Sequence, residues 1–295
     1  MFGYIRERFR LGDTVMQLLI INAVVFVILQ LFSLIGLADQ SGTGALSRIP
    51  ADLTFAASSN AGVMLHRPWS IITHMFTHLN FGHFLFNMIA MYTMGNVFTS
   101  VRGNKPIIAV YILGGLCGYI LFALTFNFAD AFSSRHGSLV LGASAAVMAI
   151  TTAAAVLDPR RVLLLFGVIK VELRWLALIL VLLDLASVRS GANSGGHIGH
   201  LGGAIFGYIY SVQLQKGNDM GRWLTNLIER IKSWFGPRRL KVVQNNGRPK
   251  SDEQFNIEKK ERQKRIDEIL DKISRSGYDS LSREEKDFLF QNAQK

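Results

Sequence analysis

The chain has very little cysteine. Its 295 residues include one, Cys117, which lies in an apolar run, so an intrachain disulfide framework is excluded. No nucleic-acid-binding module accompanies the net charge of +11, and we therefore expect no nucleic-acid partner. The sequence also lacks an internal repeat and paired broken helices, which are typical of transporters. These absences leave the apolar residues as the informative part of the chain.

Apolar residues make up 49% of the chain and come in blocks, and the mean hydropathy is +0.26. That pattern is typical of a membrane protein and not of a soluble enzyme. We predict an all-α polytopic membrane protein, a bundle of six transmembrane helices with a small helical cytosolic tail. The predicted spans are residues 15–38, 79–98, 106–126, 139–157, 173–188 and 196–214. The apolar stretch 162–171 is expected at the inner membrane interface or as an early extension of the fifth helix.

Lys and Arg residues of the short loops fall mainly on one side of these spans, which is typical of the cytoplasmic side. They precede the first span, separate the second from the third, follow the fourth and enrich the tail. We therefore expect both termini in the cytoplasm and residues 15–38 as an uncleaved membrane anchor. Ser144 and His200 then lie a few residues below the same outer face.

The chain is expected to divide into four parts. These are a cytosolic N-terminus (1–14), a six-helix membrane domain (15–215), a juxtamembrane segment and linker (216–252) and a small helical cytosolic tail (253–295). Residues 216–295 carry 19 Lys and Arg against 13 Asp and Glu, a balance suited to anionic lipid at the inner face. Trp223, Leu227, Ile231 and Trp234 predict a short amphipathic helix there. Ser282 and Glu285 have the spacing of a capping box.

Ser144 lies inside an apolar segment, in the run Gly142-Ala143-Ser144-Ala145. A lone serine in a membrane helix more often packs or bonds to backbone than acts as a nucleophile. Here, however, Gly142 and the alanines leave the turn sterically open. We expect Ser144 near a helix N-terminus, where free N–H groups favour a developing oxyanion.

His200 begins a second informative pattern. Gly199, Gly203 and Gly207 form a GxxxGxxxG series, which lets two membrane helices touch closely. His200 lies on that face, so it is brought against the partner helix. If the partner is the fourth span, His200 can take the proton of Ser144. His197, one turn earlier, is an alternative base.

The second span opens with several histidines. His83 and Asn87 are four residues apart on one helical face and are suited to hydrogen-bonding a carbonyl oxygen as negative charge develops. Metal ligation by the histidines is a weaker alternative, because no carboxylate or thiol completes a standard ligand set. His74 and His78 are expected only to attach the preceding loop to the helix.

Across residues 66–215 the chain resembles the rhomboid intramembrane serine proteases. The resemblance rests on HxxxN at His83 to Asn87, GxSx at Gly142 to Ala145, and HxxGxxxG at His200 to Gly207. It implies Ser144 as nucleophile and His200 as general base in a dyad without a third carboxylate. It also implies an oxyanion hole of His83, Asn87 and the Ser144 N–H.

The same resemblance implies further properties of the whole protein. The expected substrates are transmembrane proteins in the lipid bilayer, cut near the outer face, with the fifth span acting as a gate. No cofactor or metal is implied. The expected location is the bacterial cytoplasmic (inner) membrane, with a multi-pass topology. Substrate identity and oligomeric state do not follow from the sequence.

Two departures from the family pattern stand out. Ala145 replaces a common glycine and adds a methyl group beside the serine, and Trp69 is followed by Ser70 instead of arginine, which puts the attachment of the first loop in doubt. The alternative function is a non-catalytic rhomboid-like factor that escorts membrane proteins. Such relatives have usually lost the serine or the histidine, and this chain has both.

Overall fold

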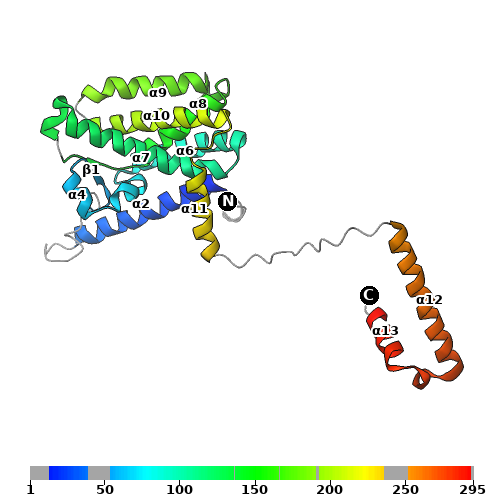
Figure 1. Cartoon of the computed structure of the whole chain (residues 1–295). Coiled ribbons are helices and arrows are strands. Elements are labelled where there is room, and N and C mark those ends of the chain that lie inside the picture. Colours follow the sequence, from blue (N-terminus) through cyan, green and yellow to red (C-terminus); the bar gives the residue numbers. More distant parts are fainter. Residues whose placement is uncertain are drawn as a thin grey trace. The chain divides into compact units, whose positions relative to one another are not determined.

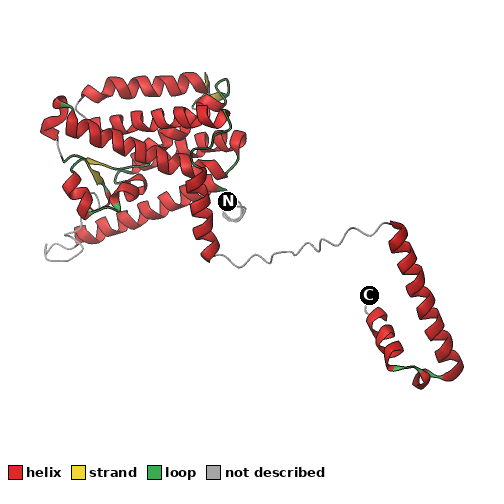
Figure 2. Ribbon diagram, in the orientation of Figure 1, coloured by secondary structure: helices red, strands yellow, loops and turns green. Residues whose placement is uncertain are grey.

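Regular structure in the computed structural model is almost entirely helical, with two small β-pairings (Figure 2). The structure describes residues 13–38, 54–135, 137–165, 167–190, 193–235 and 252–293. Contacts divide the chain into two units, residues 1–236 and 237–295. The larger unit holds the helices that correspond to the predicted spans.

Six helices match the six predicted spans, with ends that differ by a few residues. Three of them are long and apolar enough to cross a membrane within the described ranges: α2 over Thr14–Ser33, α6 and α7. Many apolar side chains on these helices are exposed, including Val24, Phe86 and Leu124, which suits contact with lipid. The helices are α2 (Thr14–Ala38), α6 (Phe81–Arg102), α7 (Lys105–Phe128), α8 (Ser144–Leu157), α9 (Leu173–Ser187) and α10 (Ser194–Gln215).

The centre of the larger unit is formed by α7, α8 and α10, whose small residues allow very close packing. The α8 and α10 helices run parallel, with contacting residues 58 positions apart over three successive turns. The contacting pairs are Gly203 with Ala145, Gly207 with Ala149, and Ser211 with Ala153. Figure 1 shows α9 at one edge of this unit, against α10, and α2 at the opposite edge.

The fourth helix begins five residues later than predicted. Leu139–Val140 forms strand β2, which pairs antiparallel with β1 (Ala57–Ser58) of the first loop, between α2 and α6. The turn Leu141 to Ala143 follows, and Gly142 adopts φ +111°, a conformation that favours glycine. The apolar run is therefore interrupted just before Ser144, which becomes the first residue of α8.

The described part of the first loop is structured and attached to the bundle. It contains β1, α4 (Ala61–His66), α5 (Ser70–Thr73) and the short 3₁₀ helix η1 (His74–Phe76). The hydroxyl of Tyr119 donates to the Ser58 carbonyl at 3.1 Å, and Asn127 Nδ2 donates to the Ser59 carbonyl at 2.7 Å. Trp69 donates to the Thr54 carbonyl at 3.0 Å. The loop is thus attached without the arginine that the family pattern has after the tryptophan.

Residues 162–172 correct the prediction of a helical extension. The described residues of this stretch form two antiparallel strands, β3 (Val162–Leu165) and β4 (Ile169–Glu172), and Gly167 between them has φ +75°. Two short runs that contain β-branched residues, separated by a glycine in a turn, favour a hairpin over a helix. Glu172 pairs with Arg174 at 2.7 Å at the start of α9, as expected for charges at an interface.

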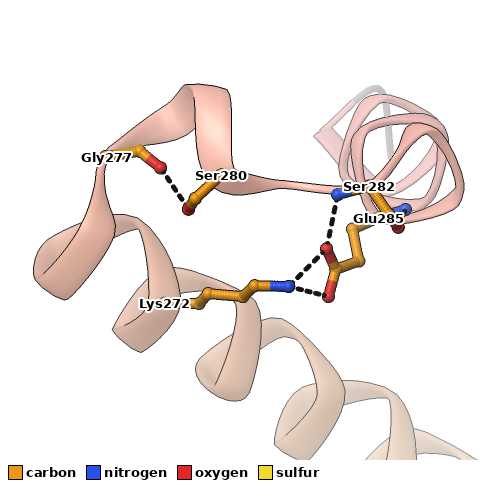
Figure 3. Close-up of polar contacts among 5 residues, drawn as sticks. All are labelled: Lys272, Gly277, Ser280, Ser282 and Glu285. Carbon is orange, nitrogen blue, oxygen red and sulfur yellow. Dashed lines mark hydrogen bonds and ion pairs between the residues drawn. The ribbon is translucent and has the colours of Figure 1, made fainter.

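Beyond α10 the amphipathic segment is confirmed as α11 (Arg222–Phe235), on which Trp223, Leu227 and Trp234 are exposed. The predicted linker lies largely outside the described residues. The second unit contains α12 (Asp252–Ser276), the 3₁₀ helix η4 (Tyr278–Ser280) and α13 (Arg283–Ala293). Ser282 and Glu285 form its capping box. Glu285 Oε2 accepts from the Ser282 N–H at 2.7 Å (Figure 3), and Ser282 Oγ accepts from the Glu285 N–H at 3.2 Å.

Candidate active site

Ser144 is the first residue of α8. Two hydrogen bonds, one to a backbone carbonyl and one to a histidine ring, hold the turn that precedes it. The N–H of Gly142 donates to the His74 carbonyl at 2.8 Å, and the N–H of Ala143 donates to His78 Nε2 at 3.2 Å. Ser144 itself is partly buried. Its N–H is among the first of the helix, which have no acceptor within the helix. The position therefore combines a hydroxyl with a backbone donor and the positive end of the helix dipole.

His74 and His78 hold this turn in place, which is more than attaching the loop to α6. Both are buried, and His74 Nδ1 also bonds to the Ser70 carbonyl at 2.9 Å. A ring nitrogen of each is thus engaged by protein atoms: one by the carbonyl of Ser70, the other by the N–H of Ala143. These hydrogen bonds give His74 and His78 a structural role beside Ser144.

His83 and Asn87 lie on the first two turns of α6, which Asn80 caps by accepting the His83 N–H at 3.1 Å. The His83 imidazole covers Gly142: a Cβ placed on that glycine would lie 2.6 Å from His83 Cε1. Asn87 Nδ2 donates to the His83 carbonyl at 2.8 Å, and the amide has a second N–H to offer. His83 is therefore adjacent to the serine turn, with Asn87 one helical turn further along α6.

His200 reaches the same region from α10. In the register of α8 and α10, His200 is level with Gly142, two residues before Ser144. The His83 imidazole covers that same glycine from α6. The fold thus brings Ser144, His83 and His200 together from three helices.

No hydrogen bond joins Ser144 to His200 among the described residues. Such bonds are often long before a substrate is bound and shorten in the reacting complex. Gly203 lies against the Ala145 carbonyl, one residue beyond the serine and one turn beyond the histidine, so the helices cannot approach more closely there. A side-chain rotation would have to complete the contact.

The methyl group of Ala145 points toward other helices. It would be 2.6 Å from a Cβ on Gly118 of α7 and 4.0 Å from one on Gly199 of α10. The family's usual glycine is thus replaced by an alanine whose extra methyl faces two glycines. The added atom fills the helix interface.

Asp184 is the site residue that the sequence analysis missed. Its Oδ1 lies 2.8 Å from His200 Nδ1 and 2.8 Å from His197 Nδ1, so the structure does not show the carboxylate-free histidine that the resemblance implies. The signal was present, because Asp184 is the one charged residue in the apolar run 175–188. An ionisable residue in a membrane segment is a functional candidate by default. The ligand atoms of Asp184, His197 and His200 all lie within 4.8 Å of one another, a set that suits a divalent metal as well as a hydrogen-bond network.

Two protein families match parts of this chain. The Rhomboid domain family matches residues 65–216, and a family of unknown function, DUF6576, matches residues 250–295. The chain is 30% identical over 157 residues to RHOMBOID-like protein 12, mitochondrial, of Arabidopsis thaliana, covering 50% of this chain and 47% of that protein. It is 22% identical over 203 residues to the rhomboid protease GluP of Bacillus subtilis, covering 69% and 37%.

A third relative is Rhomboid-like protease 2 of Toxoplasma gondii, 26% identical over 153 residues, covering 52% of this chain and 50% of that protein. The chain spans half or less of the length of these curated relatives. The family match covers more than half of the chain and includes Ser144, His200, His83 and Asn87. This chain is an integral membrane protein that belongs to the rhomboid family.

Proposed function

We propose that the protein is an intramembrane serine endopeptidase that cleaves membrane-anchored protein substrates. The observation that carries the proposal is the convergence of three helices on one turn. Ser144 begins α8, His83 of α6 covers the glycine two residues before it, and His200 of α10 is level with that glycine. Nucleophile, base and oxyanion donors are the parts that acyl transfer requires.

In this proposal Ser144 Oγ attacks the scissile carbonyl carbon while His200 Nε2 accepts the hydroxyl proton. The C–N bond of the tetrahedral intermediate then breaks, and the imidazolium returns its proton to the leaving amine. Water then attacks the carbonyl carbon of the acyl-enzyme while His200 accepts a proton from that water. The bond between Ser144 Oγ and the acyl carbon breaks, the second product leaves as a carboxylic acid, and the imidazolium returns its proton to Ser144 Oγ. No metal or cofactor takes part in these steps.

The oxyanion is assigned to the N–H of Ser144, the imidazole of His83 and the amide of Asn87. The Ser144 N–H is supported by its place at the helix N-terminus, and His83 by its contact with Gly142. Asn87 is buried, with one N–H bound to the His83 carbonyl and the other N–H for the substrate. A single oxyanion donor is typically worth about 10²- to 10³-fold in rate.

We further propose that both termini lie in the cytoplasm of a bacterial cell, with the site near the outer face of its cytoplasmic membrane. The Lys and Arg distribution supports this orientation. The relatives named above are a bacterial protein, a plant protein named as mitochondrial and a protein of Toxoplasma gondii. The substrates would then be transmembrane proteins whose cleavage site lies at that depth.

Reconstitution with a single-span reporter substrate in liposomes tests the proposal. The reporter carries small residues near the outer end of its span, and cleavage is followed by gel shift. We expect cleavage by the wild type and none by Ser144→Ala. Ser211→Ala is the matched control, because Ser211 is also in the bundle but bonds to the Ala153 carbonyl, away from the proposed site. Cleavage by Ser144→Ala would contradict the proposal, and a folded wild type that binds but never cuts would favour an escort function.

A further inference from the structure

We propose that Asp184 is the positioning residue of this site, and that its carboxylate fixes the His200 imidazole in the orientation and tautomer that a general base needs. The inference rests on the proposed function and extends the serine–histidine pair to a serine–histidine–aspartate arrangement. It comes from the contact between α9 and α10, which neither the family match nor the relatives' names describe.

The geometry places one carboxylate oxygen between two histidines. Asp184 Oδ1 lies 2.8 Å from Nδ1 of His200 and 2.8 Å from Nδ1 of His197, which stand one turn apart on α10. The Asp184 side chain is 9% exposed, while that of His200 is 21% exposed and that of His197 is 23% exposed. The carboxylate is therefore the inner partner, and the imidazoles extend from it toward solvent.

The chemistry of the donors fixes the tautomer. An ionised carboxylate can only accept hydrogen bonds, so each Nδ1 must carry the hydrogen. In a neutral imidazole the other nitrogen, Nε2, then has the free lone pair. For His200 that nitrogen is the one which must take the Ser144 proton. A ring without a partner at Nδ1 would be free to adopt the opposite tautomer or to turn away.

Burying the Asp184 carboxylate at this position costs free energy, so an aspartate is not expected there unless it has a role. It lies in the last turn of α9, where the helix dipole disfavours a negative charge, and its neighbours in the helix are apolar. Apart from Asp184, the buried residues of α9 are Leu173 and Ala177, both in its first two turns. The two histidine N–H groups supply the compensation that a buried carboxylate requires.

His200 and His197 are not equivalent on this carboxylate. In the register of α8 and α10, His200 is level with Gly142, which the His83 imidazole covers. His197 lies one turn nearer the start of α10, beyond the level of that turn. We therefore assign His200 as the base and His197 as a second donor that helps to neutralise the carboxylate.

The test compares the full-length wild type with Asp184→Asn, Asp184→Glu and Ser144→Ala in detergent. Each is labelled with a fluorophosphonate probe at several concentrations, which separates the maximal labelling rate from the probe's apparent affinity. Asparagine keeps the shape of aspartate but presents an N–H to the imidazole, so the wrong tautomer is favoured. Thermal unfolding of each variant is measured in parallel, and the wild type is also labelled after treatment with EDTA.

We expect Asp184→Asn to lower the maximal labelling rate by roughly 10²- to 10⁴-fold with little change in probe affinity. Asp184→Glu, which keeps the acceptor, should recover at least about tenfold of that loss. A rate for Asp184→Asn within about threefold of the wild type would overturn the inference. So would equal losses in both variants accompanied by equal losses of thermal stability, or abolition of wild-type labelling by EDTA, which would make the cluster a metal site.

A wild type that is folded but unlabelled, or a Ser144→Ala variant that still labels, would instead remove the proposed function. A second measurement needs no change at position 184. The ¹⁵N chemical shifts of the His200 imidazole, assigned by their loss in His200→Ala, should show a protonated Nδ1 and an unprotonated Nε2 in the wild type. The reverse tautomer would overturn the inference even if the Asp184 variants fail to fold.

Discussion

The carbonyl of Ala145 lies directly against the Cα of Gly203, so α8 and α10 meet backbone to backbone beside the candidate nucleophile and base. No side chain fits between the two helices at this point. The contact limits how far Ser144 and His200 can be separated, so the proposed activity depends on the packing of small residues.

Gly203→Ala should therefore impair both folding and activity. The new methyl group would overlap the Ala145 carbonyl and push α10 away from α8 at a typical cost of about 1–3 kcal/mol. We expect a lower unfolding temperature and a labelling rate reduced by about tenfold or more. Gly199→Ala is the matched control, because its Cβ would meet the nearest atoms at 3.9 and 4.0 Å, an ordinary contact. Equal effects of the two changes would contradict this account of the interface.

Gly142→Ala should reduce activity for two reasons that a control can separate. Its φ of +111° strains any residue with a Cβ, and that Cβ would lie 2.6 Å from the His83 ring. Gly137 also has a positive φ, +87°, but a Cβ there meets nothing within 4 Å. We expect Gly137→Ala to cost only backbone strain and to keep labelling. If the Gly142→Ala variant reacts with the probe as fast as the Gly137→Ala variant, the contact between His83 and the turn is not required for activity.

Ala145→Gly should leave the chemistry almost unchanged. The methyl group faces Gly118 and Gly199, so its removal opens the helix interface and not the space around Ser144. We expect a stability loss of about 0.5–1 kcal/mol, as for glycine in a helix, and a labelling rate within about threefold of the wild type. Thermal unfolding and labelling time courses check the two parts. A large gain in rate would show that the methyl group narrows the site after all.

The second helix of the tail, α13, should become less stable as the pH falls. The Ser282 N–H and the Lys272 ammonium, 2.9 Å away, hold the pKa of Glu285 below its usual range (Figure 3). Because the ionised form is the one stabilised, the contribution to folding is present above the carboxyl pKa of the unfolded chain. It is lost as the pH drops through the lowered pKa of the folded tail.

Hydrogen exchange of the full-length protein measures this effect. Amides of α13 should exchange faster at acidic pH, after correction for intrinsic rates, and Glu285→Ala should produce the same change at neutral pH. Glu284→Ala removes an equal charge from the same first turn but leaves the capping box intact. The capping role fails if Glu284→Ala exposes α13 as much as Glu285→Ala does.

The positions of most membrane helices could be predicted from the sequence, because the length of an apolar segment is a local property of the chain. The ends of α9 and α2 lie within one residue of their predicted positions. The start of α8 did not follow, since Leu139 and Val140 are apolar enough for a helix. They become a strand because Ala57 and Ser58, far away in the sequence, pair with them. A local pattern contains no information about such a partner.

The candidate site likewise combines features that the local sequence reveals with contacts that depend on the fold. The motifs around Ser144, His83 and His200 were visible, and the shared face of the glycines indicated which helices meet. The contact of His200 with Asp184 did not follow from the motifs, because the resemblance implies a serine–histidine pair alone. The available signal was Asp184 itself, the one charged residue in the apolar run 175–188. Which histidine contacts that carboxylate depends on how α9 crosses α10, which no spacing within either helix reveals.

The most direct test of the central claim is the site at which a fluorophosphonate attaches to the full-length protein. The probe adduct on the purified wild type would be located by peptide mass spectrometry, with His200→Ala and heat-denatured wild type run alongside. The account predicts a single adduct on Ser144 that is absent from both controls. An adduct on another serine, or none on a folded wild type at any pH between mildly acidic and alkaline, would contradict it.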